Sequence, residues 1–70
     1  AVDPQGYVFF TDPPNNRVVK LNPSGEVLAV TGTAGKSAGQ FDLPLGIAVD
    51  GSNLMVVDSG NGRVVTIGQP

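Results

Sequence analysis

Apolar residues along this chain gather in short runs in which β-branched and aromatic side chains dominate. Residues 7–11 and 54–57 are nearly unbroken apolar runs, which predicts strands covered on both faces. Three more strands with mixed polar positions are expected at residues 17–21, 26–30 and 63–67. Another is expected within residues 41–49, mainly after Pro44, because proline interrupts a central ladder.

Turn-forming residues separate these runs. Residues 22–25 place Pro23 where a type I turn needs a preset φ and Gly25 where the turn closes. Ten glycines and six prolines would interrupt most helices in so short a chain. The sequence therefore predicts an antiparallel meander. Its longest connection, residues 33–40, is rich in small residues and is expected to be a flexible surface linker.

One motif occurs twice in the sequence. Ala1-Val2-Asp3 returns as Ala48-Val49-Asp50, and the run Asp12, Asn15, Arg17 returns as Asp58, Asn61, Arg63. The offset is 48 − 1 = 47 at the front and 58 − 12 = 46 at the end. A repeat of this period is typical of solenoids and propellers, whose single units cannot bury their own apolar faces.

The strands group in fours, which predicts an all-β fold of antiparallel four-stranded blades. Residues 1–38 are expected to hold the second to fourth strands of one blade plus an interblade linker. Residues 39–70 are expected to hold the first to third strands of the next blade, so the chain is cut out of phase with a partial blade at each end.

The recurring residues resemble the NHL repeat. The resemblance rests on Gly35, Gly39-Gln40-Phe41, Pro44, Gly46-Ile47-Ala48-Val49-Asp50, Asp58-Ser59-Gly60-Asn61 and Arg63-Val64, with the first copy matching the second half. Two turns depart from it, since the second copy is one residue short near residues 51–53 and Pro13-Pro14 replaces the usual Ser-Gly. The resemblance implies an NHL-type β-propeller, usually of six blades. Such relatives act as protein- or RNA-binding modules, as extracellular sensor domains of bacterial kinases and, in one branch, as a metal-dependent lyase.

Composition limits the partners and the compartment. A net charge of −2, with four scattered basic residues, gives no positive field for a phosphate backbone and disfavours nucleic acid. No apolar run approaches the ~18 residues of a membrane span. Cysteine and histidine are absent, so neither a disulfide nor a zinc site can stabilise the fold. A domain of this size is only marginally stable without such a cross-link. Family analogy and low lysine content favour an extracytoplasmic setting.

Candidate catalytic and metal-binding groups have simpler structural interpretations. Asp12 with Arg17 and Asp58 with Arg63 could be catalytic or metal-binding, but their recurrence in both copies favours ion pairs that lock each hairpin.

The remaining aspartates are given turn-capping roles: Asp3 and Asp50 precede turns, and Asp42 belongs to no dense carboxylate motif that would hold calcium. Without histidine or cysteine, the chain has no complete catalytic set, so no enzyme activity and no cofactor are expected.

Two further features invite a ligand interpretation. Gly35-Lys36-Ser37 resembles part of a phosphate-binding loop, yet Val30 stands where that loop needs glycine and no helix is expected to follow. We interpret it as an ordinary linker. The aromatic residues could stack on bases or sugars, but packing between blades is favoured. These residues are Tyr7, Phe9, Phe10 and Phe41.

In a meander, the turns alternate between the two ends of the sheet. Residues 13–16, 33–40 and 59–62 are expected at one end, and residues 3–6, 22–25 and 50–53 at the other. In NHL relatives, the first of these ends is the usual recognition face. The residues expected to contact a partner are Asn15, Asn16, Lys36, Ser37, Asn61 and Arg63.

Three functions stay open. The leading hypothesis is a non-catalytic interaction module that binds a protein or other ligand through loops on one face, with further blades of the same propeller as its neighbours. The second is a homo-oligomer whose copies close a ring through open strand edges. The third is part of a propeller enzyme whose catalytic residues lie in other blades.

Overall fold

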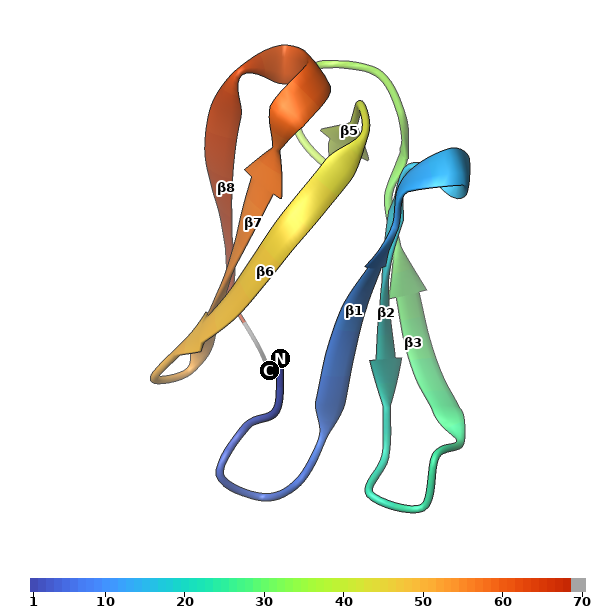
Figure 1. Cartoon of the computed structure of the whole chain (residues 1–70), viewed down its shortest axis with the longest axis vertical. Helices are drawn as coiled ribbons and strands as arrows, with labels where there is room; N and C mark the ends of the chain where they lie inside the picture. The colour runs from blue at the N-terminus through green and yellow to red at the C-terminus, as the bar shows by residue number, and fades with distance from the viewer. Residues whose placement is uncertain (69–70) are drawn as a thin grey trace.

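Two three-stranded antiparallel sheets lie against each other in the computed structural model, which describes residues 1–68 (Figure 1). The first sheet has the order β1 (Val8–Asp12), β2 (Arg17–Leu21), β3 (Val27–Thr31), and the second has the order β6 (Pro44–Asp50), β7 (Asn53–Asp58), β8 (Arg63–Gly68). Short 3-10 turns, η1 (Pro13–Asn15) and η2 (Ser59–Asn61), join β1 to β2 and β7 to β8. The all-β, antiparallel prediction is confirmed.

The connection between the two sheets has its own small element. β4 (Thr33–Ala34) and β5 (Gln40–Phe41) pair in parallel, two residues each. Before β1, the chain contributes only a bridge between Val2 and Val8. The described residues contain no helix long and apolar enough to cross a membrane. Residues 69 and 70, the last two of the expected second segment, lie outside the described residues.

β6 confirms the strand that the sequence predicted mainly after Pro44, and Pro44 itself is its first residue and is buried. Proline fits here because β6 is an edge strand of its sheet and Pro44 begins it, so no central ladder bond is lost. The β6–β7 register shifts between Pro44 and Ile47, which marks a bulge.

The repeat is visible in the strand register. Asp12 pairs with Arg17 at the end of the β1–β2 ladder, and Asp58 pairs with Arg63 at the end of the β7–β8 ladder. The two hairpins therefore match residue by residue at an offset of 58 − 12 = 46. By this offset, Phe9 is equivalent to Met55.

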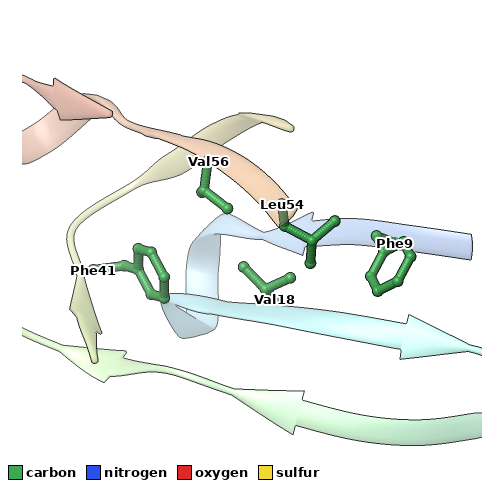
Figure 2. Close-up of a cluster of buried hydrophobic side chains, with 5 residues drawn as sticks. All are labelled: Phe9, Val18, Phe41, Leu54 and Val56. Carbon is green, nitrogen blue, oxygen red and sulfur yellow. The ribbon is translucent and has the colours of Figure 1, made fainter. Parts of the chain in front are cut away.

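The hydrophobic core lies between the two sheets (Figure 2). Its five buried residues come from the first sheet, from β5 and from β7: Phe9, Val18, Phe41, Leu54 and Val56. Because side chains alternate along a strand, Phe9 enters this core while Phe10 points to the opposite face and is 41% exposed. The expectation that these strands are covered on both faces is therefore wrong for this chain by itself, and core packing of the aromatics does not extend to Phe10.

The two sheets touch along β1 and β6 and diverge from there. The Thr11 hydroxyl on β1 donates a hydrogen bond of 2.8 Å to the Leu45 carbonyl on β6. Farther out, a cavity of about 180 Å³ separates the sheets, and its lining includes Ala29 and Thr31 on β3 and Ile67 on β8. The pair of sheets is thus a wedge with β1 and β6 at its narrow side (Figure 1).

Candidate functional site

Two turns and the segment between the sheets gather at one end of the molecule, which we call the linker end: residues 13–16, 33–43 and 59–62. Direct hydrogen bonds join its parts. The Leu43 amide donates to Asn16 Oδ1 at 3.0 Å, and the Gly60 amide donates to the Asp42 carbonyl at 2.7 Å. Asn61 Nδ2 donates to the Gly35 carbonyl at 2.8 Å.

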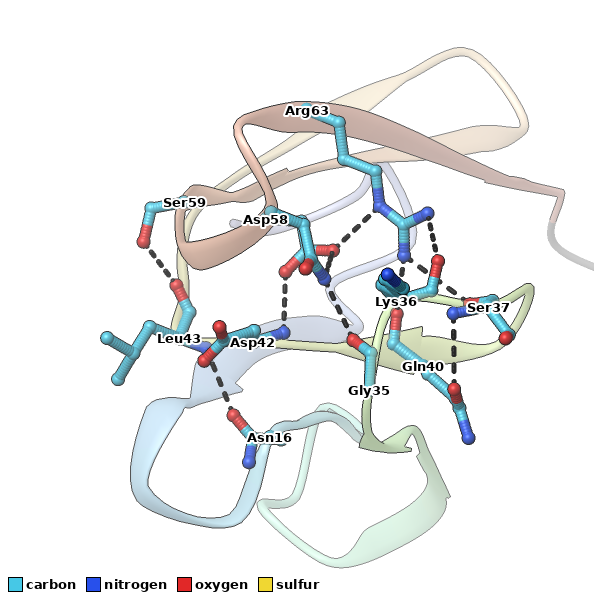
Figure 3. A network of polar contacts seen from close by, with 11 residues as sticks. Asn16, Gly35, Lys36, Ser37, Gln40, Asp42, Leu43, Asp58, Ser59 and Arg63 are labelled. Carbon is cyan, nitrogen blue, oxygen red and sulfur yellow. Dashed lines mark hydrogen bonds and ion pairs between the residues drawn. The ribbon is translucent and has the colours of Figure 1, made fainter.

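Asp58, the last residue of β7, is the centre of this end (Figure 3). Its side chain has no exposed surface, and it accepts hydrogen bonds from the Asp42 amide at 2.7 Å, Asn61 Nδ2 at 2.8 Å and Arg63 Nε at 2.8 Å. Burial alone would raise the pKa of Asp58, but the donors Asn61, Asp42 and Arg63 outweigh it and hold the pKa below its ordinary value. The carboxylate is therefore a structural anion.

Arg63 connects Asp58 to the linker backbone. Its Nη1 donates to the Lys36 carbonyl at 2.8 Å, and its Nη2 donates to the Gln40 carbonyl at 2.9 Å and the Ser37 carbonyl at 3.4 Å. The planar guanidinium can serve several acceptors at once, as a lysine cannot. The side chain of the following hairpin thus holds three carbonyls of the linker that the sequence predicted to be flexible.

The equivalent pair in the first hairpin is more exposed. Asp12 accepts from Asn15 Nδ2 at 3.0 Å and from Arg17 Nε at 2.7 Å, and the two side chains of the ion pair are 21% and 42% exposed. Hydrogen bonds from Asn15 and Arg17 hold the pKa of Asp12 below its ordinary value. Within residues 1–68, no linker lies across this pair as it does across Asp58 and Arg63.

The linker end brings together all six residues expected to contact a partner, in two groups. Asn16, Asn61 and Arg63 are half-buried and hold the backbone in place. Asn15, Lys36 and Ser37 have exposed side chains at the same end. Beside them is a hollow of about 250 Å³, and the residues that line it are Asn16, Ala34, Gly35, Lys36, Phe41, Asp42 and Asn61.

Sequence reasoning did not assign a role at this end to Gln40 or to Leu43. Gln40 Oε1 accepts from the Ser37 amide at 3.1 Å and so closes the linker turn, and the Leu43 carbonyl accepts from the Ser59 hydroxyl at 2.5 Å. The recurrence of a motif could not point to either residue, because the described chain holds only one copy of this linker.

Asp3 and Asp50 lie at the opposite end. Asp3 Oδ1 accepts from the Gln5 and Tyr7 amides, both at 3.0 Å, and so caps the first turn. Asp50 is exposed and pairs with Asn53 across the turn between β6 and β7. In the described part of the chain, no three carboxylate, histidine or cysteine side chains gather as metal ligands would.

The segment after Ser37 is a turn followed by β5, so Gly35-Lys36-Ser37 does not lead into a helix. A phosphate-binding loop needs such a helix terminus. No known protein-family model matches the chain.

Proposed function

We propose that this chain supplies parts of two blades of an NHL-type β-propeller and acts as a non-catalytic module that binds a protein segment at its linker end. The 46-residue equivalence of the two hairpins supports the blade assignment, as does the bridge from Val2 to Val8, which is where a preceding strand would pair. The proposal of an NHL-type propeller rests on the motif residues that resemble the NHL repeat.

The observation that carries the binding proposal is the Arg63 network. Arg63 and Asn61 fix the carbonyls of Gly35, Lys36 and Ser37, so the side chains of Lys36 and Ser37 project from an ordered backbone. Loops held by a rigid scaffold bind with less loss of conformational entropy than mobile loops do. A loop whose backbone is held by hydrogen bonds and whose polar side chains are exposed, such as Lys36 and Ser37, is suited to recognition.

The chemistry of the same end favours binding over catalysis. A general acid or base works best with a pKa near neutral. Asp12 and Asp58, which border this end, have their pKa held below the ordinary value and are already paired with arginines. They stabilise the hairpins on which the exposed side chains stand.

A peptide library displayed on phage and selected on the immobilised chain tests this proposal. We expect enriched peptides whose binding falls at least about tenfold, or 1.4 kcal/mol, when Lys36→Glu or Asn15→Ala is introduced. Ser52→Lys, in an exposed turn at the opposite end, is the matched control and should leave binding unchanged. Enriched peptides that bind the linker-end variants as well as they bind the original chain would refute the proposal, as would a selection without enrichment.

A further inference from the structure

Each sheet has an outward face of exposed apolar side chains. On the first sheet, Phe10 is 41%, Leu28 52% and Val30 49% exposed. On the second sheet, Met55 and Val64 are 39% and 57% exposed. Contiguous apolar patches on a small protein mark surfaces that another molecule covers.

The repeat relates these exposed faces to the buried ones. We define the leading face of each hairpin by three positions, which are Phe9, Val18 and Lys20 in the first sheet and Met55, Val64 and Thr66 in the second. The trailing face has the alternate positions, which are Val8, Phe10, Val19 and Leu21 in the first sheet and Leu54, Val56, Val65 and Ile67 in the second.

Inside the chain, a leading face packs on a trailing face. Phe9 and Val18 from the leading face of the first sheet form the core with Leu54 and Val56 from the trailing face of the second sheet (Figure 2). The two faces left outside are the trailing face of the first sheet, where Phe10 is exposed although Val19 is buried (3% exposed), and the leading face of the second. These are the two halves of the same contact, each presented to solvent on opposite sides of the molecule.

We propose that copies of this chain associate head to tail, with the leading face of the second sheet of one copy packed on the trailing face of the first sheet of the next. This association repeats between chains the contact that already holds each chain together, and it does not depend on the binding function proposed above. Because the two faces differ, the contact is heterologous, so each copy can engage two neighbours.

The side chains of the two outer faces suit such a contact. The strands of the internal contact combine Phe9 and Val18 with two aliphatic residues, and the outer contact would combine Met55 and Val64 with Val8 and Phe10, so each set of strand residues contains one phenylalanine. The internal core also contains Phe41 from β5. The positions that define the two outer faces carry no charged residue. The Asp12–Arg17 ion pair lies at the end of the trailing face of the first sheet, at the place that Asp58 and Arg63 occupy in the second. Lys20, in the internal contact, is replaced by Thr66 at the equivalent outer position.

The wedge shape of the chain bears on whether such an assembly closes into a ring. The sheets touch along β1 and β6 and diverge towards β3 and β8. If each junction between chains repeats this wedge with no shift along the axis, every step turns the same way, and the assembly closes into a ring of fixed size; a shift at each step would give a filament instead. We therefore infer a discrete, closed homo-oligomer.

Sedimentation equilibrium on the 70-residue chain, with two variants, tests this inference. Phe10→Lys places a charge on the trailing face, and Val64→Lys places one on the leading face. We expect a discrete oligomer for the original chain and a monomer for either variant alone. An equimolar mixture of the variants should form a 1:1 dimer, because each supplies the face that the other lacks. Gln5→Lys adds the same charge in an exposed turn and should leave the oligomer intact.

The mixing experiment distinguishes this arrangement from its alternatives. If the chain associated through two identical faces, one of the two variants would still self-associate, and mixing would form no heterodimer. A folded monomer at every concentration would also overturn the inference and would assign the faces to a different partner. Circular dichroism checks the fold of each variant, and Val30→Lys and Met55→Lys on the same two faces replace either variant that unfolds.

Discussion

Asp58 and Asp12 occupy equivalent positions, yet only Asp58 is buried. Replacing Asp58 by asparagine removes the anion that Arg63 and the Asp42 amide face, and leaves those donors poorly paired inside the protein. The same change at Asp12 affects an exposed ion pair, which contributes little. We expect Asp58→Asn to lower the urea midpoint several times more than Asp12→Asn does, with both measured by circular dichroism at one chain concentration. Equal shifts would contradict this ranking.

The same two carboxylates predict how stability depends on pH. Both have a pKa held below the ordinary value in the folded chain, so the folded state binds fewer protons than the unfolded state in acid. Their contribution is present above the unfolded pKa of about 3.9 and is lost as the pH falls through the folded values. Urea midpoints between pH 7 and about pH 2 should fall below about pH 4, and less so for the double variant Asp12→Asn/Asp58→Asn. An identical acid slope in the double variant would show that other groups are responsible.

At the scale of the elements, the linker and the hairpin that follows it act as one unit. Arg63→Lys keeps the charge but cannot hold three linker carbonyls, so the backbone around Lys36 should open more often. Trypsin followed by mass spectrometry should show cleavage after Lys36 rising several-fold. Arg17→Lys is the matched control in the other hairpin and should leave this cleavage rate unchanged. If both variants are cut alike, Arg63 does not hold the linker.

Gly32 is the point where β3 gives way to the linker. Its φ is +113°, and a Cβ there would lie 2.7 Å from both the Asn16 carbonyl oxygen and a ring carbon of Phe41. Gly25 also has a positive φ, +88°, but nothing lies within 4 Å of its Cβ position. Gly25→Ala should cost about 1–2 kcal/mol of unfolding free energy for the backbone conformation alone. Gly32→Ala should cost clearly more in urea titrations, and equal costs would show that the chain shifts to admit the methyl group.

Elements formed by contacts between residues close in the sequence could be predicted, and elements formed by distant contacts could not. The β-branched runs and the turn residues around them locate β2 and β8 closely, because pairing within a hairpin is local. The pinned linker could not be predicted, since Arg63 reaches carbonyls 23 to 27 residues earlier in the chain. The parallel β4–β5 pair could not be predicted either, because strands of two residues are too short to show a pattern in the sequence.

At the scale of the whole molecule, the repeat predicted that one unit cannot bury its own faces, and Phe10 shows the physical consequence. Its equivalent in the second hairpin, Val56, has no exposed surface because the first sheet covers it. The two residues have the same place in the repeat and differ only in whether a neighbouring sheet is present. Sequence alone identifies such positions as apolar but not which copy is covered, because that depends on what packs beside it.

The proposed head-to-tail association makes the stability of the chain depend on its concentration. A domain of 70 residues with five clustered core residues is marginal by itself, so covering the two outer faces should add a large share of its stability. Mass action then raises the thermal midpoint as the chain becomes more concentrated. Each tenfold increase corresponds to about 1.4 kcal/mol per association step, which is several degrees for a protein of this size. Calorimetry over a roughly hundredfold concentration range should show this rise for the original chain and a flat midpoint for Phe10→Lys. A midpoint of the original chain that does not move would mean that its apolar faces remain in water, and that its stability comes from the internal contact alone.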